Sequence, residues 1–292
     1  MHRVLVLRGG ALGDFIVTLP ALAALRQGWP AARLELAGNA TAAQLALTRG
    51  LLDAVHSQHE ARWAALYSAA PLSPDFAAWL ASFDLVLNYW PDPAGELARH
   101  FPLHAAQRFL SAPAHPTLSP AAAHYGGPLR ALGLTPENFH SLTWPQPAAR
   151  LIAIHPGSGS PAKNWPLPRW LELCAWLKHT HRAELLLITG EAESPATRAA
   201  LAPFGRAAHQ LPLEQLVGAL AECRLFLGHD SGVSHLAAAC GVPSLLLFGP
   251  TDPALWAPRA AHVRVLKRGP TLSEISLSDA QAAIAPLLSA QI

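Results

Sequence analysis

The sequence repeats one unit near the start of each half: a short apolar run, then a loop that contains glycine, then an amphipathic stretch. In the first half the run Val4–Leu7 precedes the loop Arg8–Asp14. In the second half the run Leu151–Ile154 precedes the loop His155–Lys163. A buried strand, a loop and a helix in this order are typical of parallel βαβ units. The chain is therefore predicted to be α/β, with a parallel sheet in each half.

A proline-rich segment between the two units gives the expected domain boundary. A chain of 292 residues suits two domains of about 150 residues each. Pro145 and Pro147 lie within three residues, which disfavours both a helix interior and a central strand. We expect residues 1–148 to form an N-terminal domain and residues 149–292 a C-terminal domain, each a Rossmann-like, doubly wound sheet.

Further apolar runs predict the other strands, and amphipathic stretches predict helices. The expected strands lie at 4–7, 33–37, 85–87, 151–154, 184–188, 225–227 and 244–248, and the expected helices include 15–27, 213–222 and 233–240. Glycines follow three of these strands, at Gly190, Gly228 and Gly249. Ligands of open α/β sheets bind outside the carboxyl ends of the strands, so we expect the functional site at that edge.

Charge and composition exclude several classes of protein. Lysine and arginine number 21 against 19 acidic residues, a balance too even for a protein that binds nucleic acid by neutralising many phosphates. The longest uncharged run, Ser231–Thr251, is interrupted by glycine and proline, so it predicts a helix and a strand instead of a membrane span. The N-terminus lacks the apolar core of a signal peptide, and the three cysteines are widely spaced. These features favour a cytoplasmic protein without disulfides or structural zinc.

The loop Gly157–Gly159 and Lys163 predict an anion site. Backbone N–H groups between a strand and a helix, together with the positive end of the helix dipole, favour a bound anion. Lys163 is one of only three lysines in the chain, although a solvated loop lysine is the plainer interpretation. The string does not match the phosphate-binding pattern of ordinary ATPases.

Two other polar positions follow strands. Asp14 is predicted either to cap the first helix or to accept a proton from a substrate hydroxyl, and one residue can do both. Asp230 and Ser231 are expected at the capping positions of a helix, with His235 about one turn inside it. A helix histidine bonded to nearby backbone is the plainer role for His235. These groups lack the nucleophile elbow of a hydrolase, no D-x-D pair occurs, and neither metal dependence nor nicotinamide binding is expected.

Taken together, four strings resemble glycosyltransferase family 9, the ADP-heptose:lipopolysaccharide heptosyltransferases. They are R-G-G-A-L-G-D at 8–14, H-P-G-S-G-S-P-A-K-N-W-P at 155–166, and D-S-G-V-S-H-L-A-A-A at 230–239 followed by F-G-P-T-D-P at 248–253. The resemblance implies a GT-B fold, in which two Rossmann-like domains face each other across a cleft. It also implies that the C-terminal domain binds the nucleotide-sugar donor, the N-terminal domain binds the acceptor, and the anomeric carbon is inverted without a metal or other cofactor.

The resemblance assigns roles by position. Asp14 corresponds to the base that deprotonates the acceptor hydroxyl, and Glu191 to the contact with the donor ribose. The residues implied for the donor's diphosphate and sugar are Gly157, Ser158, Gly159, Lys163, Asp230, Ser231, Gly232 and His235. The N-terminal half has no lysine, so contacts to a phosphorylated acceptor are predicted to come from arginines, with Arg62, Arg99 and Arg108 as candidates.

The leading interpretation is a cytoplasmic glycosyltransferase at the inner face of the membrane. It would transfer a heptose or related sugar from ADP-heptose, or a similar donor, to a lipopolysaccharide or other surface glycan. Two alternatives stay open at this point. A nucleotide-sugar epimerase with the GT-B architecture would release nucleotide without an acceptor, and an accessory protein would bind the nucleotide-sugar without turnover.

Overall fold

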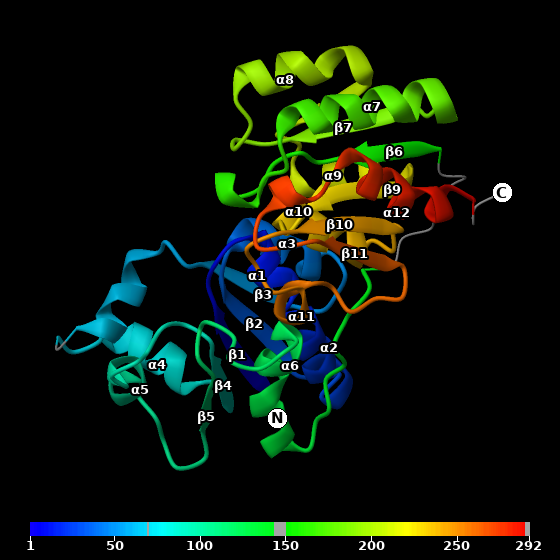
Figure 1. Cartoon of the computed structure of the whole chain (residues 1–292). Helices are drawn as coiled ribbons and strands as arrows, with labels where there is room; N and C mark the ends of the chain where they lie inside the picture. The colour runs from blue at the N-terminus through cyan, green and yellow to red at the C-terminus, as the bar shows by residue number, and fades with distance from the viewer. Residues whose placement is uncertain (69, 143–149, 290–292) are drawn as a thin grey trace. The chain divides into compact units, whose positions relative to one another are not determined.

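A computed structural model of the chain describes residues 1–68, 70–142 and 150–289. The chain divides into two compact units, Met1–His140 and Ser141–Ile292, and each contains one sheet with helices on both faces (Figure 1). The predicted boundary between residues 148 and 149 lies outside the described residues. No helix among the described residues has both the length and the apolar character needed to cross a membrane.

The sheet of the N-terminal unit is parallel throughout, with strand order β3-β2-β1-β4-β5. Its strands are β1 (Arg3–Arg8), β2 (Arg33–Gly38), β3 (Ala54–Ser57), β4 (Leu85–Asn88) and β5 (Arg108–Ser111). The central strand β1 is buried on both faces, and Val4–Leu7 have no exposed surface. A strand covered on both faces must be apolar along its length, which explains the unbroken run in the sequence.

Helices cover both faces of this sheet. They are α1 (Leu12–Ile16), α2 (Leu19–Gly28), α3 (Ala40–Leu47), α4 (Pro74–Ala81), α5 (Glu96–His100) and α6 (Ala121–Gly126), with 3-10 turns η1 (Ala61–Tyr67) and η2 (Gly127–Leu132). The predicted single helix 15–27 is wrong, because the structure has α1 and α2 there. Pro20 enforces the break, since a proline ring inside a continuous helix would clash with the carbonyl of Ile16.

The sheet of the C-terminal unit is also parallel, with strand order β11-β10-β9-β6-β7-β8. Its strands are β6 (Leu151–Ile154), β7 (Leu185–Thr189), β8 (Arg206–His209), β9 (Cys223–His229), β10 (Ser244–Phe248) and β11 (Val263–Lys267). Its helices are α7 (Leu167–His181), α8 (Pro195–Leu201), α9 (Leu213–Ala221), α10 (Gly232–Ala239), α11 (Pro253–Trp256) and α12 (Leu277–Ser289), with 3-10 turns η3 (Pro161–Lys163), η4 (Ala202–Phe204) and η5 (Leu272–Glu274). A core cluster that includes Trp170 and Leu177 of α7 and Ile284 of α12 covers one face of this sheet.

Both sheets have the strand order of Rossmann-like folds, so the predicted α/β, doubly wound architecture is confirmed. The chain's direction across the sheet reverses between β1 and β4 in the N-terminal unit, and between β6 and β9 in the C-terminal unit. Ligands of doubly wound sheets bind at the carboxyl ends of the strands beside this reversal. The loops that follow β1, β6 and β9 therefore occupy the positions expected for binding and chemistry.

Candidate functional site

Asp14 follows β1 at the reversal point of the N-terminal sheet. The structure corrects its predicted capping role: α1 begins at Leu12 and its N-cap is Ala11, so Asp14 is the third residue of the helix. Its carboxylate still satisfies an open amide, because Oδ2 accepts a hydrogen bond of 3.0 Å from the backbone N–H of Ala11. The side chain is 34% exposed. Asp14 therefore presents a carboxylate to solvent from a fixed position.

The other carboxylate oxygen of Asp14 is held by Arg8, the last residue of β1. Arg8 Nη2 lies 3.1 Å from Asp14 Oδ1, and the arginine is buried, with 4% of its surface exposed. Arg8 Nε donates to Thr18 Oγ1 at 3.0 Å. The guanidinium also lies over the ring of Tyr125, with its carbon 4.3 Å from the ring centroid. Sequence analysis did not single out this arginine, although a charge ending a buried strand was a visible signal.

The loop after β6 brings Lys163 to the end of β9. Lys163 Nζ lies 2.9 Å from Oδ2 of Asp230, the residue that follows β9. Asp230 is buried, whereas the lysine side chain is 32% exposed. Two residues that are 67 positions apart in the sequence thus form one ion pair at the reversal point of the C-terminal sheet. The pair leaves part of the ammonium group open to solvent, where it can meet an anion.

His229, the last residue of β9, anchors the end of the same loop. Its Nε2 accepts a hydrogen bond of 2.9 Å from the backbone N–H of Trp165, two residues after Lys163. Burial lowers the pKa of His229 to about 3, so the ring is neutral at physiological pH and can accept this bond. Its ring also packs edge-on against Trp170, with 5.2 Å between the centroids. His229 therefore fixes the loop beside Asp230, a role that the sequence did not reveal.

Within the loop, the predicted donor-binding residues differ in what they can offer. The Ser158 hydroxyl is buried and bonds inside the loop, to the carbonyl of Ser160 at 2.8 Å and to Oδ1 of Asn164 at 2.7 Å. Gly159 has open space where a side chain would project. Ser158 thus shapes the loop, while the backbone around Gly159 is accessible.

The end of β9 also starts helix α10. Ser231 is its N-cap, as expected from the sequence, and accepts a bond from the backbone N–H of Ser234. Gly232 opens the helix, and His235 is buried in its second turn. His235 Nε2 is 3.9 Å from Asp230 Oδ1, which exceeds hydrogen-bond distance. The N-terminus of α10 therefore points its amide groups toward the same edge as Lys163.

Two glutamates, Glu191 and Glu193, follow β7 (Leu185–Thr189) at the carboxyl edge of the same sheet. Glu191, the predicted ribose contact, is exposed in the turn after β7. Glu193 is 5% exposed: its Oε2 accepts a bond from the backbone N–H of Gly190, and its Oε1 has no hydrogen-bond partner. A side chain at Gly157 could not fit, because its Cβ would lie 1.3 Å from Glu193 Oε1. The structure thus places Glu193, and not Glu191, against the predicted anion loop.

The structure places the three predicted acceptor arginines on different elements of the N-terminal unit. Arg108 begins β5, so it lies at the amino end of the sheet, whereas Asp14 follows the carboxyl end of β1. Arg99 is exposed in α5 and bonds to the carbonyl of Ala94, near its own helix. Acceptor contact by these two residues stays a prediction without structural support.

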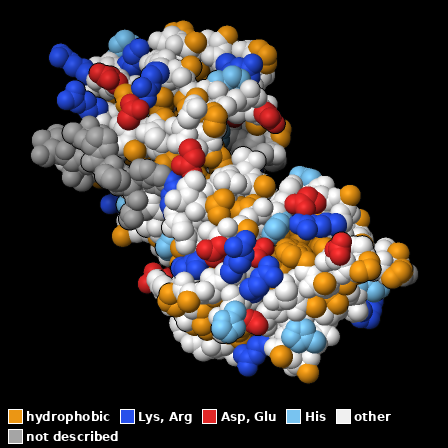
Figure 2. Space-filling model, turned by 180° about the vertical axis from the view of Figure 1, so that it is seen from behind, with side chains coloured by type: hydrophobic (Ala, Val, Ile, Leu, Met, Phe, Trp, Pro, Cys, Tyr) orange, Lys and Arg blue, Asp and Glu red, His pale blue; other side chains and the backbone are white. Residues whose placement is uncertain are grey.

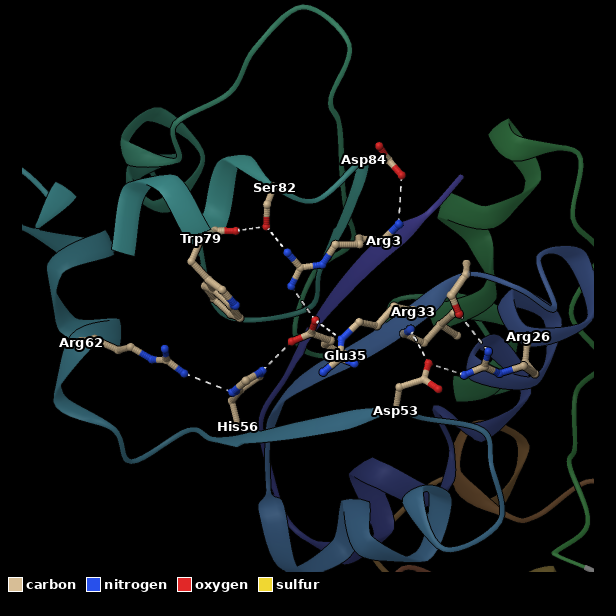
Figure 3. Close-up of polar contacts among 12 residues, drawn as sticks. Arg3, Arg26, Arg33, Glu35, Asp53, His56, Arg62, Trp79, Ser82 and Asp84 are labelled. Carbon is tan, nitrogen blue, oxygen red and sulfur yellow. Dashed lines mark hydrogen bonds and ion pairs between the residues drawn. The ribbon is translucent and has the colours of Figure 1, made fainter. Parts of the chain in front are cut away.

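Arg62 belongs to a charged cluster around buried Glu35, which we call the Glu35 cluster (Figure 3). Arg62 donates to His56 Nδ1 at 3.1 Å, so the neutral His56 ring donates from Nε2 to Glu35, 2.8 Å away. Arg3 and Arg33 also bind Glu35, at 2.6 and 2.9 Å. The Glu35 cluster crosses β1, β2 and β3 on one face of the sheet. The Arg62 side chain is 34% exposed, so its contact with an acceptor stays a prediction.

The described residues contain no group of three or more histidine, cysteine, aspartate or glutamate side chains arranged to hold a metal ion. The three cysteines, Cys174, Cys223 and Cys240, are buried free thiols.

On the face of the molecule in Figure 2, lysine and arginine side chains lie beside aspartate and glutamate side chains. This mixed surface agrees with the near-zero net charge of the sequence.

Comparison with known proteins identifies the family. The family model described as "Glycosyltransferase family 9 (heptosyltransferase)" matches residues 131–278, just over half of the chain. The chain belongs to glycosyltransferase family 9. This glycosyltransferase is 24% identical over 286 residues to lipopolysaccharide heptosyltransferase 1 of Salmonella typhimurium, an alignment that covers 87% of this chain and 90% of the relative.

Solved structures place the fold of this family 9 glycosyltransferase. A family 9 glycosyl transferase from Veillonella parvula superposes with a TM-score of 0.80 at 21% identity, covering 99% of this chain and 98% of the other. The E. coli heptosyltransferase WaaC with ADP gives a TM-score of 0.75 at 20% identity, covering 98% and 99% of the two chains. The prediction of a GT-B fold built from two Rossmann-like domains is confirmed.

Proposed function

We propose that this protein transfers a heptose from ADP-heptose to a lipopolysaccharide core, with inversion at the anomeric carbon and without a bound metal or other cofactor. Three kinds of observation support the proposal. The Salmonella relative named above is a lipopolysaccharide heptosyltransferase. A structural neighbour was solved with ADP. At the carboxyl edges of the two sheets, Arg8 holds the Asp14 carboxylate and Asp230 holds the Lys163 ammonium. A carboxylate and an ammonium are the two charges that such a reaction needs.

The observation that carries the proposal is the pairing of Lys163 with Asp230 beside the N-terminus of α10. A departing nucleoside diphosphate develops negative charge as its bond to the sugar breaks. The Lys163 ammonium, the backbone N–H groups around Gly159 and the positive end of the α10 dipole can stabilise that charge. In this account Asp230, Ser231, Gly232 and His235 surround the diphosphate and the sugar, and Lys163 with the backbone N–H groups takes the place of Mg²⁺.

Asp14 supplies the base. Its exposed carboxylate accepts the proton of the acceptor hydroxyl while the hydroxyl oxygen forms a bond to the anomeric carbon. The bond between that carbon and the diphosphate oxygen breaks on the opposite face, so the configuration inverts and ADP leaves with the bonding electron pair. The products are the extended glycan, ADP and a protonated Asp14, which returns its proton to solvent.

The donor ribose is assigned to the carboxylates after β7. Ribose hydroxyls are hydrogen-bond donors, and a buried carboxylate oxygen without a partner favours such a donor strongly. Glu193 Oε1 is buried without a partner beside Gly157, so its side chain has to turn toward the ribose when the donor binds. Glu193 is therefore the contact that we propose, and exposed Glu191 is the alternative carried over from sequence.

We further propose that the acceptor binds to the N-terminal unit at the inner face of the cytoplasmic membrane, where lipopolysaccharide precursors present their sugars. The decisive experiment measures ADP release from ADP-heptose with and without a heptose-deficient lipopolysaccharide acceptor. Acceptor-dependent release supports the transferase. ADP release at the same rate without the acceptor would instead indicate an epimerase-like activity. Binding of ADP-heptose without ADP release, across several acceptors, would indicate an accessory protein.

A further inference from the structure

We propose that Arg8 is a positioning residue that aims the Asp14 carboxylate at the acceptor hydroxyl. The inference rests on the proposed role of Asp14 as the base. Arg8 reaches Asp14 twice: its Nη2 lies 3.1 Å from the carboxylate Oδ1 and 3.1 Å from the backbone carbonyl oxygen. One guanidinium nitrogen thus fixes the side chain of Asp14 relative to its own main chain.

Arg8 can hold Asp14 because Arg8 itself cannot move. It is the last residue of the central strand β1, and its backbone pairs with Gly38 of β2. Its Nε donates to Thr18, and Thr18 Oγ1 in turn donates to the Asp14 carbonyl at 2.9 Å. The Tyr125 ring covers the guanidinium. Arg8, Thr18 and Asp14 therefore form a closed ring of hydrogen bonds on a rigid strand.

The second oxygen of Asp14 is fixed independently. The turn before α1 needs a positive φ at Gly10, where φ is +102°, and it brings the N–H of Ala11 to Oδ2. A side chain at Gly10 would place its Cβ 2.7 Å from that oxygen. Each carboxylate oxygen has two lone pairs. Arg8 and Ala11 engage one lone pair of each oxygen, and the exposed part of the side chain leaves a lone pair for a substrate proton.

Stability alone is a poor explanation for this arrangement. This ion pair is weak evidence for stabilisation, because burying the Arg8 charge costs about as much as its attraction to the partly exposed Asp14 returns. Lysine could replace Arg8 only in part, since a single ammonium nitrogen cannot reproduce the fork that donates to Thr18 and Asp14 from different atoms. The forked geometry of the guanidinium group is therefore the property that position 8 requires.

The test compares Arg8→Met and Arg8→Lys with the wild-type protein, measuring kcat for transfer and the Kd of ADP-heptose separately. Misplacing a catalytic group by 1 Å can lower the rate by about 100-fold, so Arg8→Met should lower kcat by about that factor while the donor Kd stays unchanged. Arg8→Lys should recover part of the loss. Arg26→Met is the matched control, because Arg26 pairs with Asp53 at 2.6 Å, away from Asp14, and should leave kcat unchanged.

A double variant separates positioning from a structural role. If Arg8 acts through Asp14, adding Arg8→Met to Asp14→Asn should cause no further loss of rate. A further loss in the double variant, or a donor Kd that weakens in parallel with kcat in Arg8→Met, would overturn the inference. Wild-type kcat in Arg8→Met with a strong loss in Asp14→Asn would overturn it and leave the proposed base intact. Full activity in Asp14→Asn would instead refute the base.

Discussion

The two units present opposite charges on the same framework. In the N-terminal unit a buried arginine, Arg8, supports a carboxylate, Asp14, that is 34% exposed. In the C-terminal unit a buried carboxylate, Asp230, supports an ammonium, Lys163, that is 32% exposed. Each pair lies beside the strand where the order of the sheet reverses. In both units, then, a buried partner of opposite sign fixes an exposed charge.

The exposed charges of the two units have opposite signs, which suits them to different chemical tasks on the same architecture. An exposed carboxylate can take up a proton, whereas an exposed ammonium stabilises an anion. We therefore propose that the same strand, loop and helix supply a base in one unit and a phosphate-binding group in the other. The Glu35 cluster offers a contrast, because its charges pair with one another on a packed face, so their loss should affect stability instead of turnover.

The largest effect on stability is expected for Glu35→Ala. The change would remove the buried partner of Arg3 and Arg33, and losing a hydrogen bond between charged groups typically costs about 1.5–3 kcal/mol, because both arginines stay partly exposed to solvent. Urea unfolding of the full chain at pH 7 measures the loss. ADP binding to the C-terminal unit should stay unchanged in the folded variant, and a large loss of ADP affinity would contradict the separation of scaffold from site.

Acid should weaken the same cluster. Hydrogen bonds from His56, Arg3 and Arg33 outweigh the effect of burial, and they lower the pKa of Glu35 to about 2 in the folded protein. Because the folded-state pKa lies below the usual value of 4.5, the ionised carboxylate stabilises the fold above pH 4.5, and that contribution is lost as the pH falls toward 2. The stability gap between wild type and Glu35→Gln should therefore shrink over this range, by up to about 3 kcal/mol. A stability difference between wild type and Glu35→Gln that does not change with pH would refute the stabilising role of the ionised Glu35 carboxylate.

Lys163→Ala should weaken ADP binding by about 1–3 kcal/mol, the usual size of a charge-assisted contact. Titration calorimetry measures the change. Lys178→Ala is the matched control, since Lys178 contacts the carbonyl of Pro203 in another part of the unit. Equal ADP affinity in wild type and Lys163→Ala would remove the lysine from the diphosphate site.

The smallest effect distinguishes the two carboxylates after β7. Glu193→Gln should weaken ADP binding by about tenfold, or 1.4 kcal/mol, because the variant replaces a buried carboxylate that bonds ribose hydroxyls. Glu191→Gln should leave the affinity unchanged, since Glu191 is exposed. The opposite ranking would restore the assignment made from sequence alone.

The interior strands were predictable and the edge strands were not. Seven predicted strands correspond to β1, β2, β4, β6, β7, β9 and β10, which are the interior strands of the two sheets in the described part of the chain. The strands without a prediction, β3, β5, β8 and β11, each lie at a sheet edge and are partly exposed. An edge strand is not enclosed on all sides, so it lacks the continuous apolar run that identifies an interior one.

The residues of the candidate site also differ in how readily the sequence predicts them. Asp14 and Lys163 could be proposed from sequence because glycine-containing loops after strands are visible there, and their roles stay predictions. The groups that hold the site in place, among them Arg8 and His229, were missed because their roles depend on burial and on partners brought close by the fold. Sequence could not separate Glu191 from Glu193, because the two residues are only two positions apart and only the turn decides which carboxylate faces inward.

One measurement tests the central claim, that the exposed charges of the two units have separate tasks. Transfer by Asp14→Asn is followed in a single turnover at saturating ADP-heptose, and the Kd of ADP-heptose is measured for the same variant. The account predicts a rate at least about 100-fold below wild type, as expected for the loss of a general base, with an unchanged donor Kd. A wild-type rate, or a rate lost only because the donor no longer binds, would contradict it.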